Sequence, residues 1–437
     1  MQREAGLQVL YQQMGDAELR ALDGKWVELT VGPFEYTIRE ITQEEADAWW
    51  EANKPPPIGV PNMDLSVTGL HDIATLLDLD NLSLGDALKV AIPAFGGKAS
   101  HYAVFPYMTN DMGASDGTPC AGAGACGEGY VCKNRPEGTV CKVAVPVPKA
   151  FAIPLYYYHQ HMKTHGLDTM AKSMMADPGF INDSVVRKEK LEALQDAIKA
   201  APIDPELESL VTQKIIDDFD SIRMRFRSST NAEDLDGFTG AGLYTSKSGD
   251  LNDPDKPIAD AIRQVWASIW NYKAFQEREY RSIDHNGVGM ALLVHRSFPD
   301  EEANGVALTG NIFDTSGLEP GFYINVQHGE TSVVLPDPGV TTDSFIYYYY
   351  QPGQPVVFLS HSNLVAEGET VLTNAQTYRL GQALDWIHKY FKPLYGPTDT
   401  NPTKFFAMDV EFKFDGEPGE EPELFVKQAR PHPGWGL

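Results

Sequence analysis

Apolar and polar side chains alternate over residues 223–227, in the run Arg-Met-Arg-Phe-Arg. Because successive side chains of a strand point to opposite faces, this pattern predicts a strand with Arg223, Arg225 and Arg227 together on one face. Three like charges on one face repel each other unless an anion lies among them. Hydroxyls and glycines follow in residues 228–242, and together with arginines they are groups that bind a polyphosphate.

Other segments have the 3.6-residue periodicity of amphipathic helices, and from residue 290 onward the pattern changes to short β-rich runs separated by Gly, Pro and Asn. The predicted helices are residues 156–165, 185–200, 258–281 and 376–390. The predicted strands are residues 290–294, 305–309, 322–326, 347–350 and 356–359. This mixture of helices and strands, without internal repeats, predicts an α+β fold.

Alternation returns near the C-terminus, in residues 408–414 and again in residues 424–430. A turn-rich segment separates the two runs, so they predict a β-hairpin in which Glu411 and Gln428 lie side by side. Carboxylate and amide oxygens are hard ligands of the kind that Mg²⁺ takes beside phosphate oxygens. Arg430 shares a face with Gln428 and would help to hold the phosphates. The alternative is an ordinary amphipathic hairpin with a solvated polar face.

A glycine pair followed by a lysine, Gly96-Gly97-Lys98, comes after an apolar run that begins at residue 91. This order predicts a strand that ends in a glycine turn. Glycine would let the backbone approach a phosphate, and Lys98 would supply a point charge. A plain surface turn is the alternative for such a short motif.

Residues 1–85 are predicted to form a separate N-terminal extension, in which we find no catalytic group. The pattern within it predicts a helix at residues 6–22, a strand pair at residues 26–30 and 34–38, and a helix at residues 42–53. Three prolines at residues 55–57 would stop the last helix.

The chain has 437 residues and a formal net charge of −26. Its length allows a substantial core and two or three domains. Its negative charge argues against nucleic acid and anionic membranes as partners, because both need a basic surface. No apolar run reaches the roughly 18 residues of a membrane-spanning helix, so no membrane insertion is expected. Residues 1–10 lack the apolar core of a signal peptide.

All the cysteines, Cys120, Cys126, Cys132 and Cys141, fall within residues 116–142. Zinc sites usually use cysteine pairs separated by two to four residues, and this chain has no such pair. We predict a small loop with two disulfides, for which three connectivities are open. The alternatives are reduced thiols and a metal site. Persistent disulfides need an oxidising compartment, so the loop indicates a periplasmic or secreted location although no signal peptide is visible.

Several motifs occur along the chain in the order of one family. They are Gly96-Gly-Lys98, Val145-Pro-Val-Pro148, Arg-Phe-Arg-Ser-Ser-Thr-Asn-Ala-Glu-Asp-Leu at residues 225–235, Gly305-Val-Ala-Leu-Thr309 with Asn311, Gly329-Glu330, and the closing pair Asp409-Val-Glu411 and Gln428-Ala-Arg-Pro431. Over residues 90–432 the chain resembles the N-terminal ATP-binding domain of the pyruvate phosphate dikinase and phosphoenolpyruvate synthase family. The resemblance implies an ATP-grasp-like fold with two lobes. These would be residues 86–285, with a cysteine-rich insertion at 109–143, and residues 286–437, with a metal-binding hairpin.

The resemblance also implies ATP and Mg²⁺ as cofactors and a role for each matched residue. The phosphate-binding set would be Gly96, Gly97, Lys98 and Arg227, to which the strand pattern adds Arg225. The backbone of Leu293, Val294 and His295 would read adenine, and Glu330 would face the nucleotide near its ribose. Glu411 and Gln428 would hold Mg²⁺, while Arg227 and Arg430 would stabilise the transferring phosphoryl group.

The chain also departs from the family. The family's Thr-Arg-Asn-Pro becomes Thr-Gly-Asn-Ile at residues 309–312, so one arginine is absent and Arg223 or Arg225 would have to replace it. Family dikinases continue into a phosphohistidine domain and a pyruvate-binding barrel, for which this sequence has no room. We therefore predict an ATP- and Mg²⁺-dependent phosphotransferase domain whose acceptor lies on another chain, another domain or a small molecule. The alternatives are a nucleotide-binding or scaffold module without catalysis and a secreted interaction protein.

Overall fold

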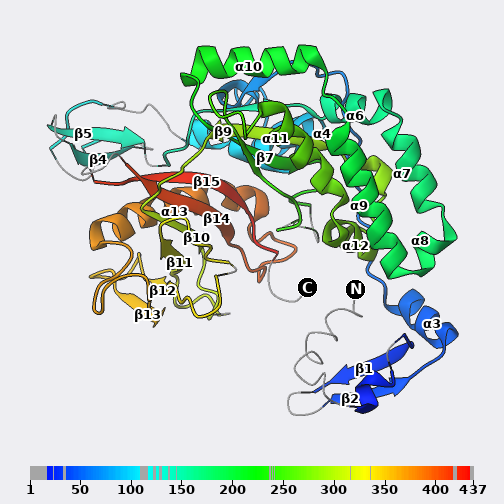
Figure 1. Cartoon of the computed structure of the whole chain (residues 1–437). Helices are drawn as coiled ribbons and strands as arrows, with labels where there is room; N and C mark the ends of the chain where they lie inside the picture. The colour runs from blue at the N-terminus through cyan, green and yellow to red at the C-terminus, as the bar shows by residue number, and fades with distance from the viewer. Residues whose placement is uncertain are drawn as a thin grey trace.

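The computed structural model describes residues 17–22, 24–32, 36–108, 117–121, 125–126, 130–135, 138–143, 145–235, 238, 240, 242–314, 316–334, 336–416 and 421–433. Within these residues, helices accompany two large sheets and two separate strand pairs, and every strand pairing is antiparallel (Figure 1). The predicted α+β fold is confirmed.

The first large sheet has five strands in the order β3-β6-β9-β7-β8. Their bounds are β3 (His71–Asp72), β6 (Ala150–Ile153), β9 (Met290–Arg296), β7 (Met224–Thr230) and β8 (Lys247–Gly249). Met224 and Phe226 of β7 are fully buried in a hydrophobic cluster with the surrounding helices. Arg225 between them and Arg227 after them therefore point to the opposite face, as the alternation predicts.

Helices cover the apolar face of this sheet (Figure 1). They are α6 (Leu155–Thr164), α7 (Leu167–Met175), α8 (Pro178–Asn182), α9 (Ser184–Ala200), α10 (Pro205–Phe219), α11 (Ile258–Ala267), η2 (Ser268–Trp270), α12 (Tyr272–Tyr280) and η3 (His285–Gly287). The helix predicted over residues 258–281 is interrupted at Asn271, whose ψ of 139° is not helical. None of the helices in the described part of the chain is long and apolar enough to cross a membrane.

The second large sheet has six strands in the order β13-β12-β11-β10-β14-β15. Their bounds are β10 (Ala303–Leu308), β11 (Phe322–His328), β12 (Asp343–Tyr347), β13 (Val356–Ser360), β14 (Met408–Asp415) and β15 (Glu423–Pro431). Apolar residues of β14 and β15 pack in a second hydrophobic cluster with α13 (Asn374–Tyr395). The predicted strand at residues 347–350 is wrong beyond Tyr347, because the chain turns there and the Gln351 N–H donates to the Tyr348 carbonyl.

Helix α4 (Leu84–Tyr102) connects the two sheets, since it contacts β7 and β9 of the first and β15 of the second. This corrects the predicted strand and glycine turn at residues 91–98. The helix continues through Pro93, and the only residue within it with non-helical backbone angles is Gly96, with φ 74°. Helix α5 (Phe105–Met108) follows it in the same hydrophobic cluster.

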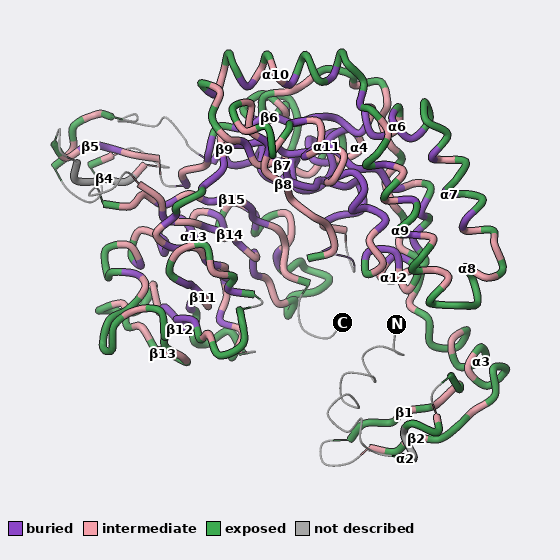
Figure 2. Tube along the Cα trace, in the orientation of Figure 1, coloured by how far each residue is buried: buried purple, intermediate pink, exposed green. Residues whose placement is uncertain are grey.

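The N-terminal segment comprises α2 (Ala17–Arg20), β1 (Val27–Val31), β2 (Tyr36–Glu40) and α3 (Gln43–Asn53). The predicted strand pair and second helix are present, whereas residues 6–16 of the predicted first helix lie outside the described residues. None of the described residues before Ile73 is buried (Figure 2). After that the chain joins the main body, because β3 pairs with β6 and η1 (Ile73–Thr75) packs in the second cluster. Residues 71–85 of the predicted extension thus include elements that pack against the main body.

Along the chain, the last strand of the first sheet is followed by the first strand of the second sheet between residues 296 and 303, which is later than the predicted lobe boundary at residue 286. Strand β9 follows that boundary, yet it pairs with β6 and β7 and forms the centre of the first sheet. Its wholly apolar sequence from Met290 to Val294 suits a strand that is buried on both faces. The division of the chain into domains remains a proposal.

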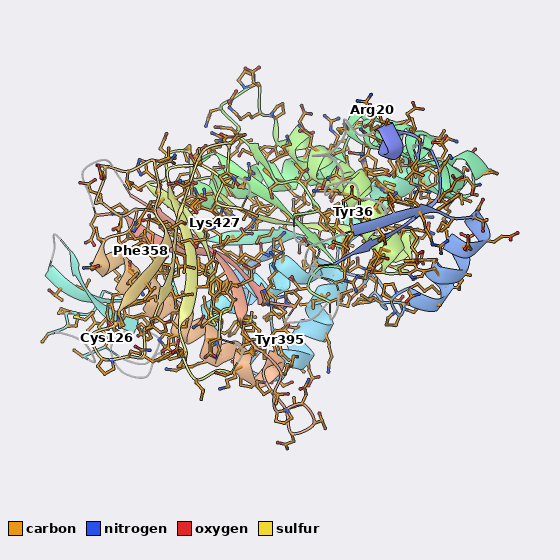
Figure 3. The ribbon with its side chains drawn as sticks, turned by 90° about the horizontal axis from the view of Figure 1, so that it is seen from below. Arg20, Tyr36, Cys126, Phe358, Tyr395 and Lys427 are labelled. Carbon is orange, nitrogen blue, oxygen red and sulfur yellow. A yellow bond between two sulfur atoms is a disulfide. The ribbon has the colours of Figure 1, made fainter. Side chains whose placement is uncertain are left out.

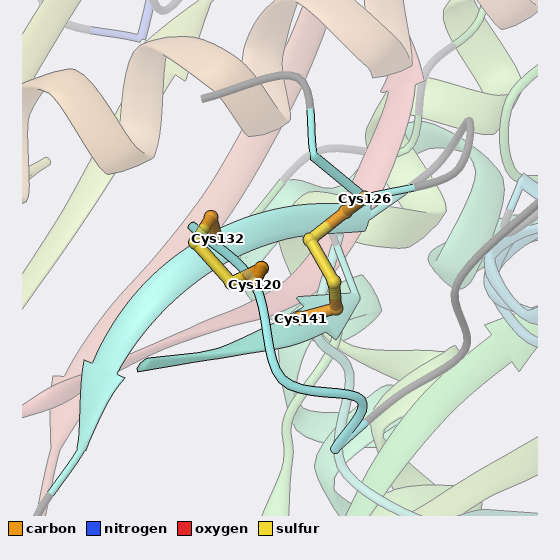
Figure 4. Close-up of a disulfide and its surroundings, with 4 residues drawn as sticks. All are labelled: Cys120, Cys126, Cys132 and Cys141. Carbon is orange, nitrogen blue, oxygen red and sulfur yellow. A yellow bond between two sulfur atoms is a disulfide. The ribbon is translucent and has the colours of Figure 1, made fainter. Parts of the chain in front are cut away.

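The cysteines lie around the strand pair β4 (Tyr130–Arg135) and β5 (Gly138–Val143), which projects at one edge of the molecule (Figure 1). They form two disulfides, Cys120–Cys132 and Cys126–Cys141 (Figure 4). The predicted two-disulfide loop is confirmed, and the structure selects one of its three connectivities. The sulfurs of Cys120, Cys126 and Cys132 are close enough to hold a metal, but each is bonded to another sulfur.

Candidate functional site

Arg227 links the two sheets. It lies on β7, and its guanidinium reaches the hairpin of β14 and β15. There Nη1 donates to the Lys427 carbonyl (2.8 Å), and Nη2 donates to Glu411 Oε2 (2.5 Å) and Gln428 Oε1 (2.9 Å). Only 8% of the Arg227 side chain is exposed. Because the guanidinium presents its donors in a rigid plane, these bonds fix the first sheet against the hairpin.

Glu411 and Gln428 lie side by side, as the sequence predicts. They are direct partners in the antiparallel pairing of β14 with β15. Beyond them the register shifts, so that Phe412 pairs with Val426 and Lys427 is the extra residue of a β-bulge. The bulge leaves the Lys427 carbonyl free to accept from Arg227.

Positive charge surrounds the Glu411 carboxylate. Burial by itself would raise its pKa, but the charges of Arg227, Lys427, Lys98 and Arg430 outweigh burial and lower the pKa of Glu411 to about 2. At the same time 36% of its side chain remains exposed. Glu411 is therefore an ionised carboxylate that a bound cation can reach.

Arg430 lies on the same hairpin, opposite Asp409. Its Nε and Nη2 both donate to Asp409 Oδ2, at 2.9 and 2.7 Å. Burial alone would lower the pKa of Arg430, but the Asp409 carboxylate outweighs it and raises that pKa above the usual arginine range. Asp409 thus keeps Arg430 charged and holds it at the end of the hairpin beyond Gln428.

Lys98 is near this group but is engaged in an ion pair. Its Nζ donates to the Ser228 carbonyl (2.9 Å) and lies 3.1 Å from Glu233 Oε1, and both side chains are almost fully buried. Burial raises the pKa of Glu233, and the charge of Lys98 opposes that effect. Lys98 is therefore held just behind β7, and its charge acts on Glu411 from there.

Gly96 and Gly97 pack against protein, which differs from the open phosphate turn that we predicted. A Cβ on Gly96 would lie 2.3 Å from the Ser229 carbonyl oxygen, and one on Gly97 would lie 2.6 Å from the Glu233 carbonyl oxygen. The kink at Gly96 interrupts the helix, and the Ser229 hydroxyl replaces the lost bonds by donating to the Phe95 carbonyl and accepting from the Ala99 N–H. In this structure the glycine pair lets α4 approach β7.

Arg225 shares the face of β7 that carries Arg227, and Arg223 directly precedes the strand. Arg225 donates to the Ser248 hydroxyl at 3.2 Å. Burial lowers its pKa, with Arg227 and Arg223 acting in the same direction and the carboxylates of Glu330 and Glu301 opposing. This face is therefore a strip of mutually repelling arginines. Residues 236, 237, 239 and 241 of the glycine loop that follows lie outside the described residues.

The adenine-reading role predicted for the backbone of Leu293, Val294 and His295 is wrong for this structure. All three residues are fully buried in the central strand β9. They pair with β6 on one side and with β7 on the other, so both edges of this backbone are already used in the sheet. Burial also lowers the pKa of the His295 side chain well below the usual histidine range.

Glu330 lies at the other sheet, in the turn after β11, and its side chain is exposed. Asn304 anchors this turn by donating to the Gly329 and Thr331 carbonyls. The charge of Glu330 acts on Arg225 of the first sheet and opposes the lowering of its pKa.

Sequence reasoning missed Asp409, Glu233 and Lys427 as members of this cluster. The sequence pattern did contain a signal for Asp409. It lies two residues before Glu411, on the same face of the predicted strand, and it falls opposite Arg430 in the hairpin. The Arg-Ser-Ser block contained Glu233 but gave it no role. Strict alternation would put Lys427 on the face opposite Gln428, and only the bulge changes that.

Comparison with known proteins identifies a family for the chain. The family described as "Pyruvate phosphate dikinase, AMP/ATP-binding domain" matches residues 132–436. The chain belongs to this family. The predicted resemblance is confirmed, and the chain contains the nucleotide-binding domain of the pyruvate phosphate dikinase family.

Curated relatives include several phosphoenolpyruvate synthases. The chain is 24% identical over 322 residues to "Phosphoenolpyruvate synthase" of Escherichia coli, covering 66% of this chain and 38% of that protein. It is 24% identical over 277 residues to the enzyme of the same name from Pyrococcus furiosus, covering 57% of this chain and 32% of that protein. A "Probable phosphoenolpyruvate synthase" of Methanothermobacter thermautotrophicus is 26% identical over 184 residues, which is 40% of this chain and 26% of that protein. The chain thus spans between a quarter and two fifths of the length of these relatives.

Proposed function

We propose that this chain binds ATP with Mg²⁺ between its two sheets and activates a phosphoryl group for transfer to an acceptor. The proposal is based on the contacts of Arg227. This residue lies on β7 of the first sheet and donates hydrogen bonds to Glu411 and Gln428 on the hairpin of the second sheet. Phosphoryl transfer needs little covalent help from the protein, and it depends on placing positive charge around the phosphate oxygens. A cluster of arginines and a lysine around one ionised carboxylate supplies that charge.

The donor set of the hairpin fits Mg²⁺. Mg²⁺ is typically bound through one or two carboxylates together with phosphate oxygens and water. Glu411 offers an ionised, partly exposed carboxylate, and the Gln428 amide oxygen lies beside it. When bound there, Mg²⁺ would neutralise phosphate charge.

Each arginine has a separate task in this proposal. Arg227 already donates to Glu411 and Gln428, so it orients the metal-binding pair and presents its charge to the same phosphate. Arg430, held by both of its donors on Asp409, would stabilise charge that develops on the transferring group. Arg225 and Lys98 supply further positive charge from the first sheet.

The acceptor is proposed to lie outside these residues, on another domain, another chain or a small molecule. The much greater length of the phosphoenolpyruvate synthases supports this proposal, because the match covers less than half of each of these relatives. A nucleotide-binding module without catalysis is not favoured, since the carboxylate and both arginines are in place.

Glu411→Gln tests the proposal, because it keeps the shape of the side chain and removes its charge. The measurements are the binding of Mg-ATP, by thermal shift and calorimetry, and the slow release of nucleotide product from Mg-ATP. We expect turnover to fall about 100-fold, with a smaller change in ATP affinity. Glu189→Gln, at an exposed position on α9, is the matched control and should change neither. If the unaltered chain neither binds Mg-ATP nor releases product, the proposal is wrong.

We also propose that the chain works in an oxidising compartment such as the periplasm or the extracellular space. The support is the pair of disulfides, because such bonds are rare where glutathione and thioredoxin keep thiols reduced. The names of the matched relatives give no location. Counting free thiols in the native chain tests this proposal.

A further inference from the structure

We propose that Lys427 binds the polyphosphate of the nucleotide directly, as a cation of the site that the family motifs do not assign. The inference deepens the proposed function and rests on it. It concerns one side chain of β15 that reaches the face between the two sheets because of a local irregularity in the hairpin.

That irregularity is the β-bulge at Lys427. Gln428 pairs with Glu411 and Val426 pairs with Phe412, so Lys427 has no partner residue on β14. A bulge re-aims the side chain of its extra residue, and bulges are frequent beside active sites. Here the ammonium group lies 5.7 Å from the centre of the Phe298 ring, on the side of the hairpin that also carries Lys413 and Glu411. Figure 3 labels Lys427, which is half-buried, among the side chains of the molecule.

Five of the neighbouring cations form ion pairs with carboxylates, whereas Arg225 donates to the Ser248 hydroxyl. The pairs are Lys98 with Glu233, Arg227 with Glu411, Arg296 with Asp415, Lys413 with Glu301, and Arg430 with Asp409. Within the residues that the structure describes, Lys427 has neither a carboxylate partner nor a hydrogen bond from its ammonium group. A half-buried ammonium without a partner is costly, and an anionic ligand would remove that cost.

The position of Lys427 suits a phosphate chain. Its backbone carbonyl holds Arg227, and Gln428 of the proposed metal pair is the next residue. An ammonium group carries three donors that rotate to follow phosphate oxygens, whereas the face of Phe298 offers it only a weak cation–π contact. A lysine that served packing alone would need only its aliphatic stem.

The test compares affinities for ATP, ADP, AMP and inorganic tripolyphosphate, each with Mg²⁺, in the unaltered chain and in Lys427→Met. Methionine keeps an unbranched stem without the charge. We expect ATP and tripolyphosphate to bind at least tenfold more weakly, and AMP to lose less than threefold, because AMP lacks the outer phosphates. Lys427→Arg should recover most of the ATP affinity. Lys404→Met, at an exposed position, is the matched control and should bind as the unaltered chain does. If Lys427→Met does not fold, Lys427→Gln replaces it.

The outcomes separate this inference from the proposed function. If ATP binds and Lys427→Met leaves its affinity unchanged, or weakens ATP and AMP equally, the inference is wrong while the proposed function stands. If tripolyphosphate binds in a Lys427-dependent manner and ATP does not bind, the nucleotide function fails and the anion contact stands. If neither ligand binds the unaltered chain, both are wrong.

Discussion

Gly96 is the residue with the most specific steric constraint at the contact between α4 and β7. Its φ of 74° lies in the left-handed region, and an added Cβ would lie 2.3 Å from the Ser229 carbonyl oxygen. That oxygen belongs to backbone, so it cannot turn aside as a flexible side chain would. Gly96→Ala therefore combines backbone strain with a steric clash in the core.

We predict that Gly96→Ala lowers the free energy of unfolding by about 3 kcal/mol or more, measured by urea unfolding. Gly166→Ala is the matched control. Gly166 has φ 66°, but nothing lies within 4 Å of its added Cβ, so only the strain of about 1 kcal/mol applies. Equal losses in the two variants would show that the contact with Ser229 has no role.

Individual site residues were predictable where one strand register decided them. Alternation placed Arg227 with Arg225, and the predicted hairpin paired Glu411 with Gln428. Lys427 was not predictable in this way, because one extra residue in the hairpin overrides the two-residue period. Local alternation fixes which face a side chain takes only as long as the pairing is regular.

At the scale of elements, the disulfide hairpin of β4 and β5 makes its own prediction. Its two bonds close loops with sequence separations of 12 and 15 residues. We expect none of the four cysteines to react as a thiol in the native chain, and all four to react after reduction and unfolding. Each bond of this loop length stabilises the folded hairpin by about 3 kcal/mol.

Alkylation followed by mass measurement checks the thiol count, with and without a reductant. Limited proteolysis of the oxidised and reduced forms then reports the hairpin separately from the rest of the chain. Because the two sheets lie outside this hairpin, nucleotide binding should survive reduction. Four reactive thiols in the native, unreduced protein would contradict both the disulfides and the proposed compartment.

Elements with one consistent pattern were predicted well, and those decided by packing were not. The strands β10, β11 and β13 and helix α9 lie where the pattern placed them. The pattern of residues 91–98 predicted a strand because a glycine pair follows an apolar run, but these residues belong to α4, which contacts both sheets. All of them except Ile92 and Pro93 are buried, so the segment lacks the polar face whose spacing would have identified a helix.

At the scale of the whole molecule, the sequence predicted the family and the α+β class but not which strands share a sheet. Strand β9 belongs to the first sheet although it follows the predicted lobe boundary at 286, and β3 does so although it lies within the predicted N-terminal extension. Both facts depend on pairing between segments far apart in the chain. No local pattern contains that information, so the order of strands in a sheet needs the structure.

Buried histidines make the stability of the whole chain depend on pH. His161, His285 and His295 are buried, and burial lowers the pKa of each. In the unfolded chain their pKa is about 6.5, so below that pH the unfolded state binds more protons than the folded state. The stability linked to them is fully present above about pH 6.5 and is lost as the pH falls through their folded pKa values. Each contributes up to about 1.4 kcal/mol per pH unit in that window.

We therefore predict that the free energy of unfolding falls from pH 7 to pH 5, measured by urea unfolding across this range. His161→Gln isolates one contribution, since glutamine can still donate to the Ile198 carbonyl that His161 contacts but does not titrate. Glu233 and Glu301 have raised pKa values, so the stability linked to them falls as the pH rises above about 4.5, which is opposite to the effect of the histidines. The two glutamates contribute equally in the unaltered chain and in His161→Gln. The difference between the two proteins in how the free energy of unfolding changes with pH is therefore due to His161. A variant that loses as much stability as the unaltered chain on acidification would show that His161 titrates as it does in the unfolded state.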